Sequence, residues 1–225
     1  MEVAILMGNK TKENKKRFFY PNEVLNIQKY LSPNAQATFE FQIKTGTRIE
    51  EARGFKDRPI INEEEGRCSI TLLKTKVRYN KKERAELERT EIKKHPEPRT
   101  IKIPSEYLPK LKKVIKNKKI KFLSTNAMNV SLKKSVLRYN QDNPKTPIRN
   151  PQEFSSHNIR KTFGTFLLSL GLAPSKVAQH LGHTEIVLMK NYASNDAFSE
   201  SDKQTILKIL GDLPRKLMPY RGLYL

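Results

Sequence analysis

The run HNIRKTFGTFLLSLGLAPSKVAQHLGHTEIVLMKNYA, residues 157–193, carries the clearest structural pattern in the chain. Either Ser155 or Ser156 can cap a helix that closes at Gly171 and whose apolar face consists of Ile159, Phe163, Phe166, Leu167 and Leu170. Pro174 opens a second helix, which ends at Gly182 and faces inward with Val177, Ala178 and Leu181. Thr184 can cap a third helix that carries Tyr192. This stretch predicts three consecutive helices.

Upstream, the pattern predicts two helices, two short strands and a further helix. The first helix starts near Pro21-Asn22, with apolar positions Val24, Leu25, Ile27 and Leu31, and the second covers about 34–44 and stops at Gly46. The β-rich runs SITLL (69–73) and TIKI (100–103) predict strands. Ser105 can cap a helix with Leu108, Leu111, Val114 and Ile115, and 140–151 is a predicted loop. The fold class is therefore α+β, mainly α-helical, with a small antiparallel β-sheet.

The composition points to nucleic acid as the partner. Of the 225 residues, 44 are Lys or Arg and 23 are Asp or Glu, which gives a net charge of +21. A charge this large favours a polyanion as a partner. The basic run at 9–17 predicts an N-terminal arm over 1–20, and the charged stretch at about 77–98 predicts a hairpin insertion. Any single lysine can equally belong to a solvated face.

Several classes of protein are excluded. A single cysteine supports neither a disulfide framework nor a cysteine-based zinc site, which suits a reducing compartment. No apolar stretch approaches the roughly 20 residues of a membrane span, and the first eight residues, MEVAILMG, do not have the features of a signal peptide. We therefore expect a cytoplasmic protein that acts on DNA and has no membrane partner.

Four short motifs contain the candidate chemistry; each is weak alone, and three have a structural alternative. They are Thr45-Gly46-Thr47-Arg48 with Glu51, His157-x-x-Arg160, Leu181-Gly182-His183, and Tyr192. Arg48 and Glu51, one helical turn apart, can form a purely structural pair. His157 can be an ordinary surface histidine, and Tyr192 a half-buried core aromatic.

The order and spacing of these motifs resemble the tyrosine recombinase (phage integrase) family, over about 21–193. His-x-x-Arg opens a helix, and Leu-Gly-His follows, with its histidine 26 residues after the first one and the tyrosine nine residues later. TGTRIEEA resembles the family's first arginine box. The resemblance implies the family's catalytic fold, with Arg48, His157, Arg160 and His183 as catalytic residues and Tyr192 as the nucleophile. It also implies a catalytic lysine after the second strand, for which we favour Lys74 and keep Lys76 as the alternative.

The sequence departs from the family in two places. Lys161 follows Arg160, where the family often has a histidine, and only 47 residues precede Arg48. The family's usual N-terminal DNA-clamping domain is therefore expected to be absent. Either the chain is a catalytic fragment, or the basic arm, the insertion or a partner clamps the DNA. We expect additional DNA contacts from seven lysines: Lys76, Lys112, Lys113, Lys116, Lys118, Lys119 and Lys161.

These residue types suit phosphodiester exchange without a metal or other cofactor. Arginines can clamp two phosphate oxygens, a histidine can act as the base near neutral pH, His183 can donate to the phosphate and Lys74 can protonate the 5′ oxygen. The resemblance implies that double-stranded DNA is cleaved through a 3′-phosphotyrosyl intermediate and is rejoined without ATP. It also implies that the active form is a homo-oligomer, a tetramer at the synapse. The tail, 194–225, contains a short amphipathic helix after Ser201, with Ile206, Leu207, Ile209 and Leu210. That helix either exchanges between protomers or packs on its own domain.

Three other functions compete with a site-specific recombinase or integrase. A DNA-binding accessory of the same fold lacks the reaction, although here every expected residue type is present. A type IB topoisomerase shares the phosphotyrosyl chemistry but has different motif spacing. A metal-dependent nuclease is disfavoured, because no Asp, Glu and His residues cluster at metal-ligand spacing.

Overall fold

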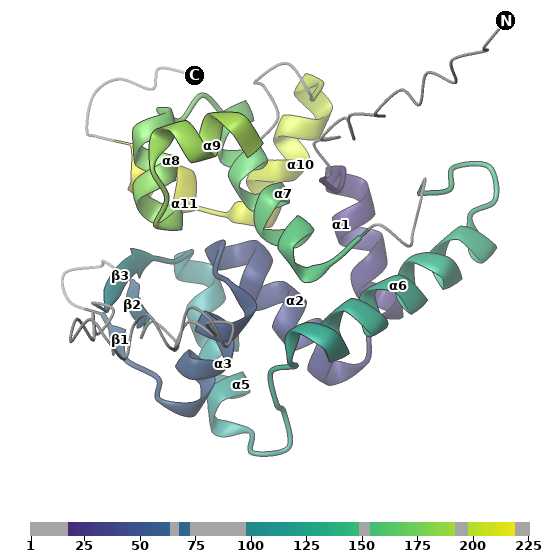
Figure 1. Ribbon diagram of the computed structural model, residues 1–225, viewed down its shortest axis with the longest axis horizontal. Coiled ribbons are helices and arrows are strands. Elements are labelled where there is room, and N and C mark those ends of the chain that lie inside the picture. Colours follow the sequence, from purple (N-terminus) through teal and green to yellow (C-terminus); the bar gives the residue numbers. More distant parts are fainter. Residues whose placement is uncertain (1–17, 64–67, 73–97, 149–153, 192–197, 219–225) are drawn as a thin grey trace, which may run out of the picture.

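A computed structural model describes residues 18–63, 68–72, 98–148, 154–191 and 198–218. Helices dominate this part of the chain, and three short strands form an antiparallel sheet (Figure 1). The mainly helical α+β fold predicted from the sequence is thereby confirmed. None of the described helices is long and apolar enough to cross a membrane.

The N-terminal half contains α1 (Pro21–Ile27), a 3₁₀ turn η1 (Gln28–Tyr30), α2 (Pro33–Thr45) and α3 (Ile49–Asp57). Helix α2 ends where predicted, because Gly46 has φ +65° and its N–H bonds to the carbonyl of Gln42. Helix α1 stops before Leu31, and Leu25, one of the apolar positions noted in the sequence, is 42% exposed. Val24 and Ile27 do face inward.

The sheet has the order β1-β2-β3, from β1 (Ile61–Asn62), β2 (Ser69–Leu72) and β3 (Arg99–Lys102). Ile61 pairs with Ile70 across the first ladder, and Leu72 pairs with Arg99 at the end of the second. The two predicted strands are confirmed, whereas β1 was not predicted because two residues are too few to show alternation. The stretch between β2 and β3 lies outside the described residues.

After the sheet come η3 (Ser105–Tyr107), α5 (Leu108–Lys116) and the long α6 (Thr125–Asp142). Helix α6 was not predicted from the sequence, and the loop expected from 140 begins only after Asp142. The apolar residues of α6 are widely spaced among polar ones. Met128, Leu132, Val136 and Tyr139 nevertheless form one buried stripe.

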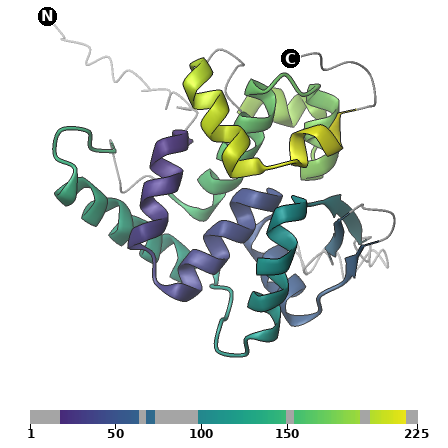
Figure 2. The same ribbon diagram turned by 180° about the vertical axis from the view of Figure 1, so that it is seen from behind.

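The C-terminal half consists of α7 (Ser156–Ser169), α8 (Pro174–Leu181), α9 (Glu185–Asn191), α10 (Glu200–Leu210) and α11 (Leu213–Leu217). Ser155 is the N-cap of α7, Gly171 has a positive φ, and Gly182 ends α8, as predicted. In Figure 2, α10 and α11 run across the face of the molecule, and α11 contacts β3. Ser199 caps α10, so this helix begins at Glu200, ahead of Ser201.

Two hydrophobic cores meet along α2, which is buried on nearly all sides. Phe39 and Ile43 belong to the core that α2 shares with α1, α6, α7, α8 and α10. Phe41 belongs to the other core, with α3, the sheet and α5. The C-terminal end of α2 therefore lies at the junction of the two halves, and the chain that leaves it passes directly into the candidate site.

Candidate active site

The turn after α2 brings the first arginine into place. A Cβ at Gly46 would lie 2.4 Å from Phe163 Cδ1, so the turn lies directly against α7. Arg48 is the N-cap of α3, and its backbone N–H donates to Glu51 Oε2 at 2.7 Å. Glutamate at the third position of a helix commonly accepts this bond. Arg48 and Glu51 are thus spaced as the N-cap and the third residue of a helix.

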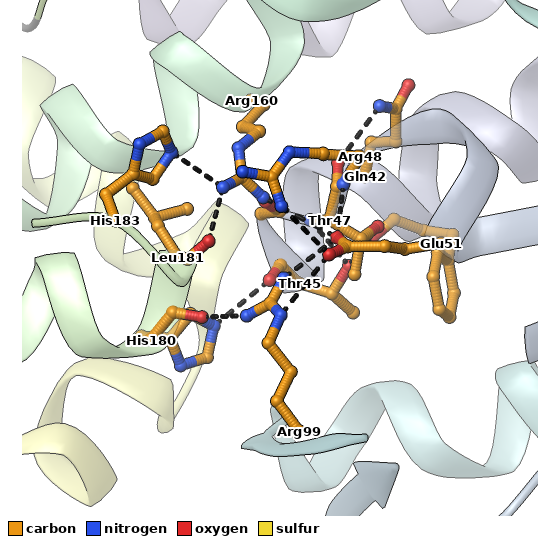
Figure 3. A network of polar contacts seen from close by, with 12 residues as sticks. Gln42, Thr45, Thr47, Arg48, Glu51, Arg99, Arg160, His180, Leu181 and His183 are labelled. Carbon is orange, nitrogen blue, oxygen red and sulfur yellow. Dashed lines mark hydrogen bonds and ion pairs between the residues drawn. The ribbon is translucent and has the colours of Figure 1, made fainter. Parts of the chain in front are cut away.

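Three guanidinium groups converge on the Glu51 carboxylate (Figure 3). Arg48 Nη1 lies 3.1 Å from Oε1, Arg99 Nη2 lies 2.8 Å from Oε2, and Arg160 Nη1 lies 3.7 Å from Oε2. The side chain of Glu51 is 4% exposed. Burial raises its pKa, but the charge and hydrogen bonds of Arg99, the backbone N–H of Arg48 and the charge of Arg160 outweigh burial and lower the pKa overall. One buried carboxylate thus organises a site that keeps a net positive charge.

Arg48 and Arg160 differ in their access to solvent. The Arg48 side chain is 51% exposed and that of Arg160 is 1% exposed. Arg160 donates from Nη1 to the Gly46 carbonyl at 2.7 Å, and from Nη2 to the Leu181 carbonyl. It therefore joins α7 to the turn after α2 and to the end of α8. Arg48 is the arginine of this pair that an incoming anion meets first.

His183 lies against Arg160. Its Nε2 is 2.6 Å from Arg160 Nη2, and a guanidinium can only donate, so Nε2 accepts and carries no proton. Burial, followed by the charges of Arg160 and Arg48, lowers the pKa of His183 to about 4. The imidazole is therefore neutral at pH 7.

His157 stands one helical turn before Arg160 on α7. Asn158 fixes the start of this helix, because its Oδ1 accepts from the Ser155 N–H at 2.8 Å. Burial lowers the pKa of His157, and the charges of Lys161, Arg160 and Arg48 lower it further. His157 is therefore a neutral imidazole near a cationic cluster, and a neutral imidazole can accept a proton.

Two further residues of the site were not found from the sequence. Arg99, the first residue of β3, binds Glu51 and donates to the His180 carbonyl. His180 is buried, stacks on Phe163 and places Nε2 3.0 Å from the Thr45 carbonyl. Burial lowers its pKa to about 4. His180 immediately precedes Leu181-Gly182-His183, but no sequence signal connects Arg99 to a carboxylate 48 residues away.

The structure brings Arg48, His157, Arg160 and His183 together. Tyr192, Lys74 and Lys76 lie outside the described residues. Lys161 adjoins the cluster, as its effect on His157 shows. The remaining lysines lie on α5 or in the turn after it; Lys112 pairs there with Glu63 at 2.6 Å, and Lys113, Lys116, Lys118 and Lys119 are exposed. Among the described residues, no three His, Cys, Asp or Glu side chains form a group that could hold a metal ion.

Comparison with known proteins identifies the family. The sequence profile described as Phage integrase family matches residues 17–198, which is most of the chain. The chain belongs to the phage integrase family. No curated protein sequence matches it significantly. The family predicted from the motif spacing is confirmed by the profile match, and the cluster around Glu51 lies within the matched residues.

Two solved structures with the same fold show the extent of the likeness. One is the Tn1549 transposon integrase in complex with a circular intermediate DNA, at 17% identity and TM-score 0.56, covering 86% of this chain and 65% of that one. The other is the XerH site-specific recombinase bound to palindromic difH substrate in a post-cleavage complex, at 18% identity and TM-score 0.51, covering 89% and 54%. The present chain thus spans less than two thirds of either relative.

Proposed function

We propose that this chain is a site-specific DNA recombinase of the integrase type, which cleaves and rejoins strands through a 3′-phosphotyrosyl intermediate. The observation that carries the proposal is the cluster of Arg48, Arg160, His157 and His183 around a buried carboxylate. Phosphoryl transfer depends mainly on positioning and on stabilisation of charge on the phosphate oxygens. Fixed guanidinium groups at a positively charged site suit that task.

The arginines would hold the scissile phosphate. Arg48 is half exposed and offers a planar donor pair to the equatorial oxygens. Arg160 lies behind it, fixed by the carbonyls of Gly46 and Leu181. A phosphate oxygen that enters here would accept from Arg48 and replace His183 as an acceptor for Arg160. Nε2 of His183 would then be free of Arg160, and in the tautomer with the proton on Nε2 it would donate to the phosphate.

Tyr192 is the proposed nucleophile. Its phenolic oxygen would attack the phosphorus while the bond from phosphorus to the 5′ oxygen breaks. His157 would accept the phenol proton, and Lys74, or Lys76 in its place, would give a proton to the leaving 5′ oxygen. Helix α9 ends at Asn191, so the tyrosine directly follows a helix that begins two residues after His183. Every group in this scheme is a side chain of the protein, and no cofactor is required.

Double-stranded DNA is the proposed substrate, and a homo-oligomer that is tetrameric at the synapse is the proposed active form. Exposed lysines on α5 and in the following turn support an electrostatic contribution to DNA binding. In the described structure α10 packs on α1, α2 and α7 of its own chain, with Ile206, Ile209 and Leu210 buried. We keep exchange of the tail between protomers as a proposal for the assembled synapse.

Strand joining between two duplexes tests the function. A recombinase should transfer a labelled strand from one duplex that contains the recognition sequence to another. A topoisomerase of type IB would relax supercoiled DNA without joining separate duplexes. A DNA-binding accessory would bind and do neither. The substrates should come from a pool of DNA flanking the coding sequence, with Tyr192→Phe as the inactive control.

A further inference from the structure

Arg99 occupies the middle of the site although no motif points to it. Its Nη2 lies 2.8 Å from Glu51 Oε2 and its Nε lies 3.3 Å from Oε1, so the guanidinium grips the carboxylate with two bonds. Its Nη1 donates to the His180 carbonyl. The Arg99 side chain is only 15% exposed. Two-point binding between a guanidinium and a carboxylate has a fixed geometry.

These contacts join three segments that are distant in the sequence. Arg99 opens β3 and pairs with Leu72 at the end of β2. Its carboxylate partner lies in the first turn of α3, and its carbonyl partner lies at the end of α8. The aliphatic part of Arg99 also passes Gly182, where a Cβ would lie 3.4 Å from Arg99 Cδ. Arg99 thus holds the sheet, α3 and the turn before His183 in one arrangement.

We propose that Arg99 is a positioning residue for DNA cleavage. It fixes the Glu51 carboxylate, and the carboxylate in turn holds Arg48 and Arg160 in position to bind the phosphate. The inference rests on the proposed function of the same site. Arg99 acts through Glu51 and the His180 carbonyl and does not touch the reacting atoms. A shift of about 1 Å in a catalytic group is enough to lower a rate by about a hundredfold.

Electrostatics supports this role. Three arginines face Glu51. Burial favours the protonated carboxyl, and the charge of Arg99 is the largest of the effects that oppose burial. Without Arg99, the pKa of Glu51 should rise. A protonated Glu51 would attract Arg48 less strongly and would be a weaker acceptor for the backbone N–H of Arg48. The removal of Arg99 should therefore disorder the arginine that is most exposed to the substrate.

The neighbouring pair of Arg53 and Glu50 provides a matched control. It lies on the same helix with an N–O distance of 2.8 Å, but its side chains are 43% and 44% exposed. Exposed pairs of this kind contribute little to stability. Arg53→Met therefore removes an arginine and its ion pair with Glu50, and it leaves the contacts around Glu51 in place.

The test compares Arg99→Met, Arg99→Lys and Arg53→Met with the unmodified chain, using single-turnover cleavage of a nicked duplex across pH. We expect Arg99→Met to cleave about a hundredfold more slowly while binding DNA within twofold of the unmodified chain. On the acidic side of the pH profile, the cleavage rate of Arg99→Met should begin to fall at a higher pH than that of the unmodified chain, because Glu51 is protonated at a higher pH in the variant. Arg99→Lys should recover part of the rate and most of the pH profile. A rate and profile for Arg99→Met equal to those of Arg53→Met would overturn the proposal.

A second measurement separates this inference from the proposed function. Carbon-13 NMR of labelled glutamate carboxyl groups reports the titration of Glu51 without any DNA, and thermal unfolding shows whether each variant folds. The Glu51 signal should titrate at a higher pH in Arg99→Met than in Arg53→Met. If the unmodified chain cleaves no DNA, the proposed function fails and this titration still decides whether Arg99 controls Glu51. An unchanged titration would contradict the inference even if cleavage were observed. Should Arg99→Met not fold, Arg99→Lys replaces it in the rate comparison, because lysine keeps the charge but not the two-point binding; a cleavage rate equal to that of Arg53→Met would then contradict the inference.

Discussion

Nε2 of His183 lies 2.6 Å from Nη2 of Arg160, and the direction of that hydrogen bond fixes the protonation of the imidazole. A guanidinium has five donors and no acceptor, so the proton of a neutral His183 must be on Nδ1. Arg160 is in turn fixed by the carbonyls of Gly46 and Leu181. The turn after α2, helix α7 and the end of α8 are thereby connected through one buried cation.

His183 should remain neutral well below its usual pKa. Burial and then Arg160 lower that pKa, so Arg160→Met should raise it toward 6.5, and nitrogen-15 NMR of the imidazole would follow the change. Lys161→Met is the matched control, since Lys161 is the largest charge effect on the pKa of His157 and is not among the main effects on His183. It should raise the pKa of His157 and leave that of His183 nearly constant. A proton on Nε2 of His183 in the unmodified chain would disprove the hydrogen bond.

Replacement of Gly46 by alanine should destabilise the fold more than replacement of Gly171. Both glycines have positive φ, +65° and +81°, so each alanine carries a backbone cost of about 1–2 kcal/mol. A Cβ at Gly46 also meets Phe163 at 2.4 Å, whereas Gly171 has nothing within 4 Å. Overpacking adds about 1–3 kcal/mol. Urea unfolding of the two variants measures the difference, and equal decreases in stability would show that α2 and α7 do not approach so closely.

Acidification should destabilise the protein through His180. The pKa of this buried imidazole is lowered from 6.5 to about 4 in the folded chain, so between these values the unfolded chain binds a proton that the folded chain does not. The contribution of neutral His180 to the free energy of unfolding is therefore fully present above about pH 6.5. It decreases as the pH falls, by about 2 kcal/mol at pH 5. His180→Gln, which keeps a donor for the Thr45 carbonyl, should show a flatter dependence in urea unfolding. The same slope in both proteins would mean that His180 is not responsible.

Neutralisation of lysines after α5 should weaken DNA binding without changing sequence preference. Lys118 and Lys119 are exposed, and each lysine that no longer binds a phosphate should reduce the slope of log affinity against log salt by about 0.9. Fluorescence anisotropy at several salt concentrations would compare the double variant to glutamine with a double variant of Lys203 and Lys208 on α10. A changed sequence preference would instead identify the two lysines as base-reading residues.

The sequence predicts helix ends well where one residue type has a strong conformational role. Gly46 and Gly182 end helices in left-handed conformations, and Pro174 begins one, as expected. It does not predict α6, since most residues of that helix are polar and its stripe becomes apparent only when α2 and α7 supply the other side of the core. Strand β1 is defined by its pairing with β2 and has too little pattern of its own.

Prediction of the site from the sequence likewise fails where a residue is defined only by its tertiary contacts. Arg48, His157, Arg160 and His183 were found because their spacing along the chain matches a family pattern, and the structure brings them together. Arg99 and His180 act through tertiary contacts to Glu51 and Thr45, and neither contact has a signature in a single sequence. Tyr192 and Lys74 lie outside the described residues, so their roles remain predictions.

Covalent trapping tests the central claim most directly. The protein would be incubated with nicked duplexes from its native flanking DNA, digested with nuclease and mapped by peptide mass spectrometry. A recombinase of this family should carry a residual nucleotide on Tyr192. Tyr192→Phe should bind DNA without forming an adduct. Tyr20→Phe alters an exposed tyrosine outside the site, so it should still form the adduct on Tyr192. An adduct of normal yield in Tyr192→Phe, or one mapped to another residue, would contradict the account.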